Sequence, residues 1–400
     1  MAISNEVAVS DGLKYVTGST YCPPVTSVPL FDIQRQMAPL RTEIDAAVSS
    51  VFDSGQFVLG PEVKQLESKI AAFCQSNFAV GCASGSDALL LALMAADIGP
   101  GDEVIVPSYT FFSTASSVTR MGATVVFADI EPKTFNIDPT DVARRITKKT
   151  KAIIPVHLFG QCADMNRLCD VAHGNDLLMI EDAAQAIGAE YQGRRAGALG
   201  DMGCFSFYPT KNLGGPGDGG MLTSNDERWA DRLSLLRGHG MRPRYYHQAI
   251  GVNSRLDSLQ AAVLNVKFPH LEQWTEMRIS NALKYNQLLG VAGLADHLEL
   301  PVETVVGRHV WNQYVIRVRG GHRDGLRNYL NEAKVGTEIY YPVPLHRQAC
   351  FSYLDYPNGS LPETEKAACE TLALPIFPEL TDEEQRYVVQ KIAAYFESVA

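Results

Sequence analysis

Residues 204–220 hold a single lysine, Lys211, in a turn between two apolar segments. Prolines stand before and after the lysine, and the glycines that follow allow the chain to return directly into a second strand. Burial beside a strand end disfavours the charged form of a lysine and lowers its pKa. A neutral amine is a nucleophile toward an aldehyde, which is the chemistry of Schiff-base lysines. A single loop lysine is more often a solvated surface residue. The neighbouring residues must therefore show whether Lys211 is a reactive, desolvated lysine.

A predicted anion site precedes an almost wholly apolar helical segment. The turn before that segment consists of Ser84, Gly85, Ser86 and Asp87. Free backbone N–H groups and the positive end of the helix dipole favour an anion such as phosphate there. The same residue types are also typical of a simple helix cap.

A carboxylate follows another buried strand, at Asp182, with Gln185 three residues later. A carboxylate in that place can keep a ring nitrogen protonated, because opposite charges favour each other's charged form. Lys211 comes one strand later, so the two side chains can lie on neighbouring strand ends that face one crevice. The alternative for Asp182 is again a helix cap.

Two further segments complete the set. An aromatic run, 109–112, follows a strand end and can lie flat against a ring, although aromatics after strands are usually core. A polar turn, 251–257, enters a helix and by itself indicates only a capped helix. Amine, carboxylate, aromatic and anion site together predict a site for a phosphorylated pyridine aldehyde, which is the chemistry of pyridoxal phosphate.

The elements that position these residues alternate between strand and helix from residue 79 onward. The predicted strands are 79–83, 103–107, 124–128, 152–156, 177–181, 203–207 and 220–223. Near-continuous apolar strands interleaved with helices predict an α/β fold whose mostly parallel sheet is covered on both faces. Ligands bind outside the carboxyl ends of such strands, and Asp129, His157, Asp182 and Ser206 lie at or just past those ends.

Three regions are expected: a flexible extension over 1–27, a large domain with the N-terminal helices over 28–255, and a linking helix with a smaller α+β domain over 256–400. Pro269 is expected to kink the linking helix. The smaller domain is predicted to hold strands at 310–318 and 336–341 and helices at 324–333 and 382–396.

Composition excludes several classes of protein. A net charge of −10 argues against nucleic acid as the main partner. The eight cysteines form no Cys-x-x-Cys pair, which favours free thiols in a reducing cytoplasm over disulfides or a metal site. The first residues lack the pattern of a signal peptide, and no apolar run is long enough for a membrane span.

Seven motifs occur in an order that resembles the DegT/DnrJ/EryC1/StrS family of sugar aminotransferases, which depend on pyridoxal 5′-phosphate (PLP). They are GSDAL (85–89), PSYTFFST (107–114), PVHLFGQ (155–161), EDAAQA (181–186), FSFYPTKNL (205–213), GDGG (217–220) and GVNSRLDSLQAA (251–262). The resemblance covers about residues 28 to 398 and implies PLP-dependent transferase fold type I, with a central seven-stranded sheet.

The resemblance also implies roles for the motif residues. Lys211 would form the covalent Schiff base with PLP and move the proton during transfer. Asp182 would pair with the pyridine nitrogen, and Gln185 would bond to the ring 3-hydroxyl. Glutamate would donate the amine and a keto nucleotide-sugar would accept it, in a ping-pong cycle.

Further positions would hold the rest of the cofactor. Gly85, Ser86 and Ser206 would bind the phosphate, and Phe111 would stack on the ring. Asn253 would reach the phosphate of the neighbouring subunit, so the protein is expected to be a homodimer with shared active sites.

The sugar is less closely specified. The loop 238–247 resembles that of members acting on 3-keto nucleotide sugars, UDP- or dTDP-linked, including the UDP-linked 3-keto-glucuronic acid type. In that loop Arg242 and Arg244 can meet a carboxylate or a diphosphate, and two solvated loop arginines are the alternative.

The segment 340–346 resembles the substrate-side strand, with Tyr341 and His346 as candidates, although many relatives have His-Tyr where this chain has two tyrosines. His309 and His157 are further candidates for the site. Buried histidines are more often structural.

Three alternatives stay open. A 4-keto nucleotide-sugar or a keto-cyclitol would suit the same fold. A PLP-dependent sugar dehydratase would have histidine in place of the lysine, and Lys211 counts against it. A cofactor-binding regulatory protein without activity is disfavoured because Lys211, Asp182 and Gln185 are all present.

Overall fold

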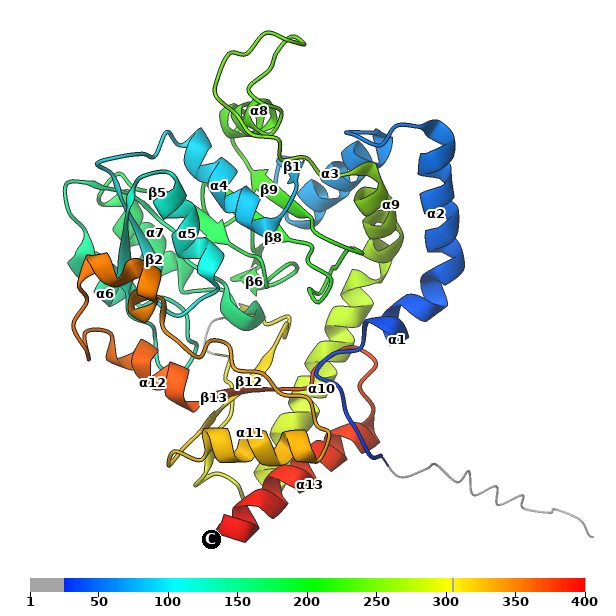
Figure 1. Cartoon of the computed structure of the whole chain (residues 1–400), viewed down its shortest axis with the longest axis vertical. Helices are drawn as coiled ribbons and strands as arrows, with labels where there is room; N and C mark the ends of the chain where they lie inside the picture. The colour runs from blue at the N-terminus through cyan, green and yellow to red at the C-terminus, as the bar shows by residue number, and fades with distance from the viewer. Residues whose placement is uncertain (1–24, 304–305, 400) are drawn as a thin grey trace, which may run out of the picture.

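The computed structural model describes residues 25–303 and 306–399 and has a seven-stranded central sheet in the order β1-β9-β8-β5-β4-β2-β3 (Figure 1). The strands are β1 Phe78–Cys82, β2 Glu103–Pro107, β3 Thr124–Ala128, β4 Thr150–Ile153, β5 Leu178–Asp182, β8 Met202–Ser206 and β9 Gly220–Ser224. Neighbouring strands from β8 to β3 are parallel, and β9 is antiparallel to both β8 and β1. The predicted mostly parallel α/β sheet is confirmed.

Successive residues of each strand enter two different cores because side chains alternate across a sheet. Ile105 and Phe205 pack on the face covered by α3, α7 and α9, whereas Val104 and Cys204 pack on the face covered by α4, α5 and α8. The first set of helices is α3 Pro61–Phe73, α7 Met165–His173 and α9 Ser258–Lys267. The second set is α4 Gly85–Ala95, α5 Phe112–Arg120 and α8 Glu227–Leu236.

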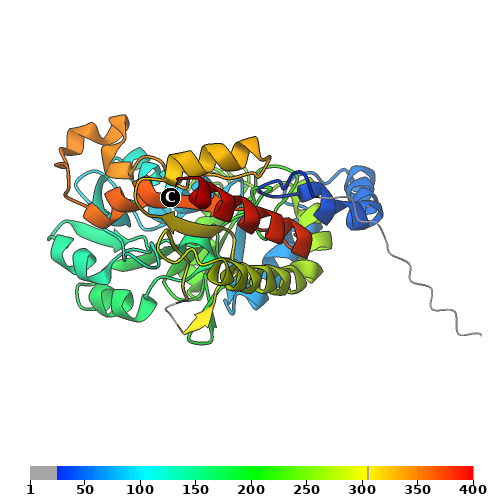
Figure 2. The ribbon, with the colours of Figure 1, turned by 90° about the horizontal axis from the view of Figure 1, so that it is seen from below.

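The linking helix is interrupted where Pro269 was expected to kink it. Helix α9 is followed by the 3₁₀ turn Phe268–His270 and then by α10 Leu271–Val291, because proline cannot donate the backbone hydrogen bond of a continuous helix. Helix α10 runs from the large sheet toward a second sheet, β10-β12-β13, whose strands are β10 Leu298–Glu299, β12 Tyr314–Val318 and β13 Thr371–Leu374. Figures 1 and 2 show α10, α11 Arg323–Glu332 and α13 Asp382–Val399 around this smaller sheet.

The predicted strand at 336–341 is wrong. This segment makes only one isolated bridge, between Glu338 and Ala373. Its backbone hydrogen bonds go to two different segments, since the Gly336 N–H donates to the Val28 carbonyl at 2.8 Å. The full pairing with β12 belongs instead to β13.

The remaining elements surround these sheets. They are α1 Ile33–Met37, α2 Arg41–Ser54, α6 Pro139–Arg145, α12 Pro362–Glu370 and a three-stranded ribbon of β11 Gly307–Arg308, β6 Glu190–Tyr191 and β7 Arg194–Arg195. The predicted extension lies mostly outside the described residues, and the boundary near residue 255 stays a prediction. In the described part of the chain, no helix is both long and apolar enough to cross a membrane.

Candidate active site

Lys211 lies in the turn that joins β8 to β9. The turn is fixed from outside the sheet, since Asn212 Nδ2 donates to the Val310 carbonyl at 2.8 Å and Lys267 Nζ donates to the Gly214 carbonyl at 2.5 Å. Lys211 as a whole residue is half-buried, but its surroundings desolvate the amine and lower its pKa to about 8, with Asp182 opposing the shift. No described residue forms a hydrogen bond or ion pair with this amine, so it is available as a nucleophile.

Asp182 ends β5, which is the neighbour of β8 in the sheet. The two strands place Asp182 opposite Cys204, at the edge from which the Lys211 turn begins. The Asp182 carboxylate is 5% exposed, and Oδ2 accepts the Thr114 hydroxyl at 2.8 Å while Oδ1 accepts the Ala184 N–H at 3.2 Å. Burial raises its pKa, and both hydrogen bonds and Lys211 act in the opposite direction. The predicted amine and carboxylate therefore lie close enough at the strand ends to influence each other's pKa.

Gln185 and Tyr341 meet beside this carboxylate. Gln185 Oε1 accepts the Phe159 N–H at 2.7 Å, which directs Nε2 toward the Tyr341 hydroxyl at 3.3 Å. The Tyr341 ring lies 6.3 Å from the ring of Phe111, which is 57% exposed. The backbone of Tyr341 is held by the Tyr109 hydroxyl at 3.0 Å. An amide donor and an exposed aromatic ring thus lie on either side of Tyr341, near this carboxylate.

The anion turn packs closely against the end of β8. Ser84 Oγ caps α4 by accepting the Asp87 N–H at 3.1 Å. A Cβ on Gly85 would lie 2.7 Å from the Ser206 Cβ, so only glycine allows this approach. Ser86 Oγ lies 2.5 Å from Ser113 Oγ at the start of α5. Hydroxyls and a helix N-terminus converge here, which is a donor set suited to a phosphate.

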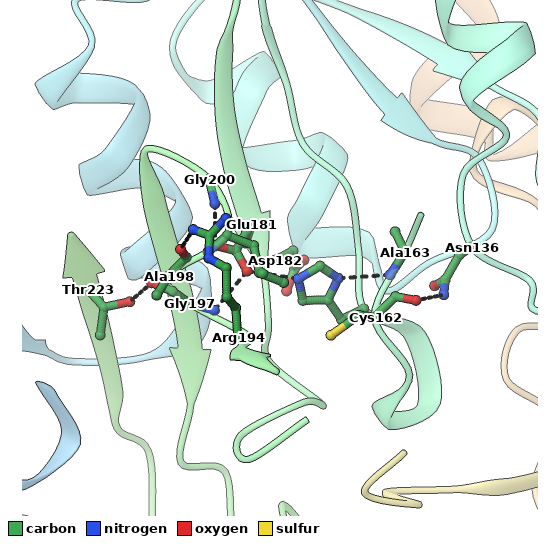
Figure 3. A network of polar contacts seen from close by, with 12 residues as sticks. Asn136, Cys162, Ala163, Glu181, Asp182, Arg194, Gly197, Ala198, Gly200 and Thr223 are labelled. Atoms are coloured by element: carbon green, nitrogen blue, oxygen red, sulfur yellow. Dashed lines mark hydrogen bonds and ion pairs between the residues drawn. The ribbon is translucent and has the colours of Figure 1, made fainter. Parts of the chain in front are cut away.

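A buried network supports the same strand end (Figure 3). Glu181 Oε2 accepts the Gly197 N–H, and Oε1 accepts the N–H groups of Leu199 and Gly200, each at 2.7 Å. His157 Nδ1 accepts the Ala163 N–H at 3.2 Å, so Nε2 carries the proton and donates to Glu181 Oε2 at 2.9 Å. Both ring nitrogens of His157 are therefore occupied by structural partners.

Two other predicted histidines lie in structural settings. The His309 ring stacks on Trp311 with centroids 3.8 Å apart, and its Nδ1 accepts the backbone N–H of Trp311. Burial lowers the pKa of His309 to about 3. His346 Nδ1 pairs with Ser108 Oγ at 2.7 Å and Nε2 with Glu365 at 3.3 Å, and burial lowers its pKa. Their roles toward substrate stay predictions.

The structure of one chain does not bring the loop residues to Lys211. Arg242 pairs with Asp231 of α8 at 2.6 Å, and Arg244 lies 4.9 Å from the exposed ring of Tyr245. Asn253 is exposed at the base of this loop, which extends beyond α8 in Figure 1. Any role for them at an active site stays a prediction.

The residues at these strand ends fit PLP. Ser86 and Ser206 at the helix turn suit its phosphate, Asp182 suits its ring nitrogen, and Lys211 suits its aldehyde. The sequence indicated no role for Thr114 or Ser113 and indicated Tyr109 only as part of an aromatic run, since the polar partners of all three come from distant segments. Only the approach of α5 to the strand ends signals Thr114 and Ser113.

Comparison with known proteins identifies the family, since a sequence model described as the DegT/DnrJ/EryC1/StrS aminotransferase family matches residues 39–393. The chain belongs to this family. It is 50% identical over 374 residues to a "Pleiotropic regulatory protein" from Geobacillus stearothermophilus, covering 94% of this chain and all of that one. It is 43% identical to a dTDP-3-amino-3,4,6-trideoxy-alpha-D-glucose transaminase from Streptomyces venezuelae, covering 93% and 97%.

A solved structure agrees with this assignment. The crystal structure of S. venezuelae DesV with a ketimine intermediate is 42% identical, covers 93% of this chain and 99% of that one, and superposes with a TM-score of 0.89. The chain is thus a PLP-dependent aminotransferase with the fold expected for the family, and PLP is its cofactor.

Proposed function

We propose that this aminotransferase transfers an amino group from glutamate to a keto nucleotide-sugar, a 3-keto hexose linked to dTDP or UDP, in a ping-pong cycle. The observation that carries the proposal is a desolvated, unpaired Lys211 amine facing Asp182 in a chain of this family. The 3-amino sugar in the name of the S. venezuelae relative supports the 3-keto position.

Several residues would hold the cofactor. Bound PLP supplies an aldehyde that carries the amino group and a cationic ring that withdraws electrons. Asp182 would keep the ring nitrogen protonated, and Gln185 Nε2 would donate to the oxygen beside the aldehyde. The turn at Gly85, together with Ser206, would bind the phosphate with backbone N–H groups and a hydroxyl.

Lys211 would move the proton. An amine with a pKa of about 8 is partly neutral near neutral pH, so Nζ can accept a proton from the carbon that bears the amino group and return it. Replacing Lys211 with alanine should abolish turnover and leave cofactor binding through the phosphate and Asp182. A Lys211→Ala protein that transaminates at the native rate would contradict the assignment.

We also infer a cytoplasmic homodimer with shared sites. Asn253, Arg242 and Arg244 are exposed, and the two arginines have partners outside the site, at Asp231 and Tyr245, which supports a role in the partner's site. A division into large and small parts near residue 255 is consistent with a crevice at the strand ends of the large sheet.

Two other candidate functions are less well supported. The lysine at position 211 counts against a dehydratase. The regulatory name of the G. stearothermophilus relative raises a non-catalytic role, but free Lys211 beside Asp182 is the arrangement that catalysis requires. Sugars with a 4-keto group and keto-cyclitols stay alternative acceptors.

The decisive experiment follows the visible absorption of the PLP-loaded protein. Glutamate should bleach the band, and adding a dTDP- or UDP-linked 3-keto hexose should restore it. A protein whose band ignores glutamate, or which stays colourless with PLP, would contradict the proposal. Running the second half-reaction backward with a panel of amino sugars would separate 3-amino from 4-amino substrates.

A further inference from the structure

Hydroxyl side chains on α5 differ in their partners. Ser117 Oγ donates to the Ser113 carbonyl at 2.7 Å and Thr119 Oγ1 to the Ala115 carbonyl at 3.4 Å, which is the usual i−4 bond of a helical hydroxyl. Thr114 departs from this pattern, because its Oγ1 lies 2.8 Å from Oδ2 of Asp182 on β5. Its one proton is therefore directed out of the helix.

The direction of this hydrogen bond is determined by its partners. An ionised carboxylate can only accept, so Thr114 must donate to Asp182. Thr110 Oγ1 lies 3.2 Å from Thr114 Oγ1 and is left to donate to it. Both threonines are buried, with no exposed surface on Thr114. A short relay, Thr110 to Thr114 to Asp182, results.

The Asp182 carboxylate can still accept further hydrogen bonds. Two carboxylate oxygens offer about four acceptor positions. Thr114 occupies one on Oδ2, and the Ala184 N–H occupies one on Oδ1. The remaining positions are free of described protein donors and can accept the N–H of a protonated ring. Fixing one oxygen at each side sets the carboxylate plane before any ligand enters.

We propose that Thr114 is a positioning residue that keeps Asp182 ionised and oriented toward the ring nitrogen of the cofactor; the inference rests on the proposed function.

The charges around Asp182 make this hydrogen bond necessary. Burial raises the pKa of Asp182, and the bond from Thr114 is the largest opposing influence. Lys211 also favours the ionised form, but its amine is itself partly neutral. His157 also lowers the pKa of Asp182, as the smallest of these influences, and its ring nitrogens are bound to Ala163 and Glu181 rather than to Asp182. Cys204 and Tyr341 also lie near the carboxylate, and because burial raises the pKa of each, both favour the neutral form and supply no charge.

The test compares three variants of the full-length protein. Thr114→Val keeps the shape and removes the hydroxyl, Thr114→Ser keeps the hydroxyl, and Thr119→Val makes the same change one turn later on α5. The measurement is PLP affinity of the apo protein as a function of pH, with the visible band of the bound cofactor recorded at each pH. Losing a hydrogen bond to a carboxylate should move the acid limit of PLP binding upward by about one pH unit in Thr114→Val.

The serine variant and the Thr119→Val control should match the wild type. Thr110→Val, which leaves the contact with Asp182 intact, should show a smaller upward shift, and it replaces Thr114→Val if that variant does not fold. Wild-type behaviour of Thr114→Val or of Thr110→Val would overturn the inference. A wild-type protein that binds no PLP or ignores glutamate would instead contradict the proposed function, so the two failures are distinguishable.

Discussion

At the scale of single residues, two lysines have lowered pKa values, and only their partners distinguish them. Burial lowers the pKa of both Lys211 and Lys267 to about 8. Lys267 Nζ is bound to the Gly214 carbonyl and lies 5.8 Å from the ring of Trp274. The Lys211 amine has no such partner in the described part of the chain and faces Asp182 instead. Desolvation makes an amine reactive, and only an unpaired one can form a new bond.

The sequence was enough to predict those site residues whose place directly after a strand indicates their chemistry. Asp182 and Lys211 follow apolar strands, so the topology of a parallel sheet brings them together. Thr114 is one of several hydroxyls on α5, and no local pattern indicates that it reaches β5. His157 also follows a strand, but whether it faces the crevice or Glu181 depends on packing that the sequence does not encode locally.

The lowered pKa of Lys211 has a measurable consequence for stability. Between about pH 8 and pH 10.5 the unfolded chain binds a proton at Lys211 that the folded apo protein has already lost, so stability should rise with pH in that window. Replacing Lys211 with methionine removes this contribution. The free energy of unfolding of wild-type apo protein should therefore gain on that of Lys211→Met from pH 8 to 10.5, as measured by urea denaturation.

If the free energies of unfolding of wild type and Lys211→Met changed with pH in the same way, a desolvated Lys211 would be contradicted. Lys267 and the buried cysteines titrate in both proteins, so the difference between the profiles isolates position 211.

At the scale of elements, the strands of the central sheet were predicted to within three residues because they are apolar runs covered on both faces, whereas β12 begins four residues later than predicted. Strand β4 begins earlier than expected, since Thr150 pairs with Glu103. Strand β13 was missed because it is only four residues long and directly follows α12. The short ribbon β6-β7-β11 was missed as well, since pairs of two residues have no periodicity.

The turn after β7 depends on one buried carboxylate, Glu181. A Glu181→Gln change puts an NH₂ group in place of one oxygen, where it faces either the N–H groups of Leu199 and Gly200 or the Gly197 N–H and His157 Nε2. At least one buried donor is left unpaired. We expect a loss of about 3 kcal/mol in the free energy of unfolding, measured in urea. Glu299→Gln is the matched control, because its bond to Arg319 is long and solvent-exposed and should contribute less than about 0.5 kcal/mol. Equal effects of the two changes would contradict a structural role for Glu181.

The approach of α4 to β8 depends on Gly85. A Gly85→Ala side chain would meet Ser206 at 2.7 Å and push the helix turn from the strand end. We expect PLP affinity to fall by about tenfold or more, corresponding to about 1.4 kcal/mol. Gly290→Ala on α10 is the control, because no atom lies within 4 Å of the added methyl group. An unchanged dissociation constant in Gly85→Ala would exclude this turn as the phosphate site.

At the scale of the whole molecule, we propose that the active site is shared between two chains. Arg242 and Arg244, the candidates named above for binding a carboxylate or a diphosphate, lie on an exposed loop together with the exposed residues Tyr245, Tyr246 and Ile250. This arrangement is what a shared site in a two-fold dimer requires. The sequence could predict the loop only through its resemblance to relatives, because an interface with another chain leaves no periodic signal.

Mixed dimers test sharing directly. Lys211→Ala and Asn253→Asp should each be inactive as pure dimers, the first for lack of the amine and the second because a carboxylate repels the phosphate. A mixed dimer, co-expressed with two tags and purified through both, would contain one site with both residues intact. We expect about half the wild-type activity per dimer. No recovery in the mixed dimer would mean that Asn253 serves its own chain, and an active pure Asn253→Asp dimer would mean that Asn253 serves no site.

The central claim is the identity of the lysine that binds the cofactor. Reducing the PLP-loaded protein with borohydride, digesting it and mapping the modified peptide by mass spectrometry identifies that lysine without any knowledge of the sugar substrate. We expect the cofactor to be attached at Lys211. Attachment at Lys267 or any other lysine, or no attachment at all, would contradict it.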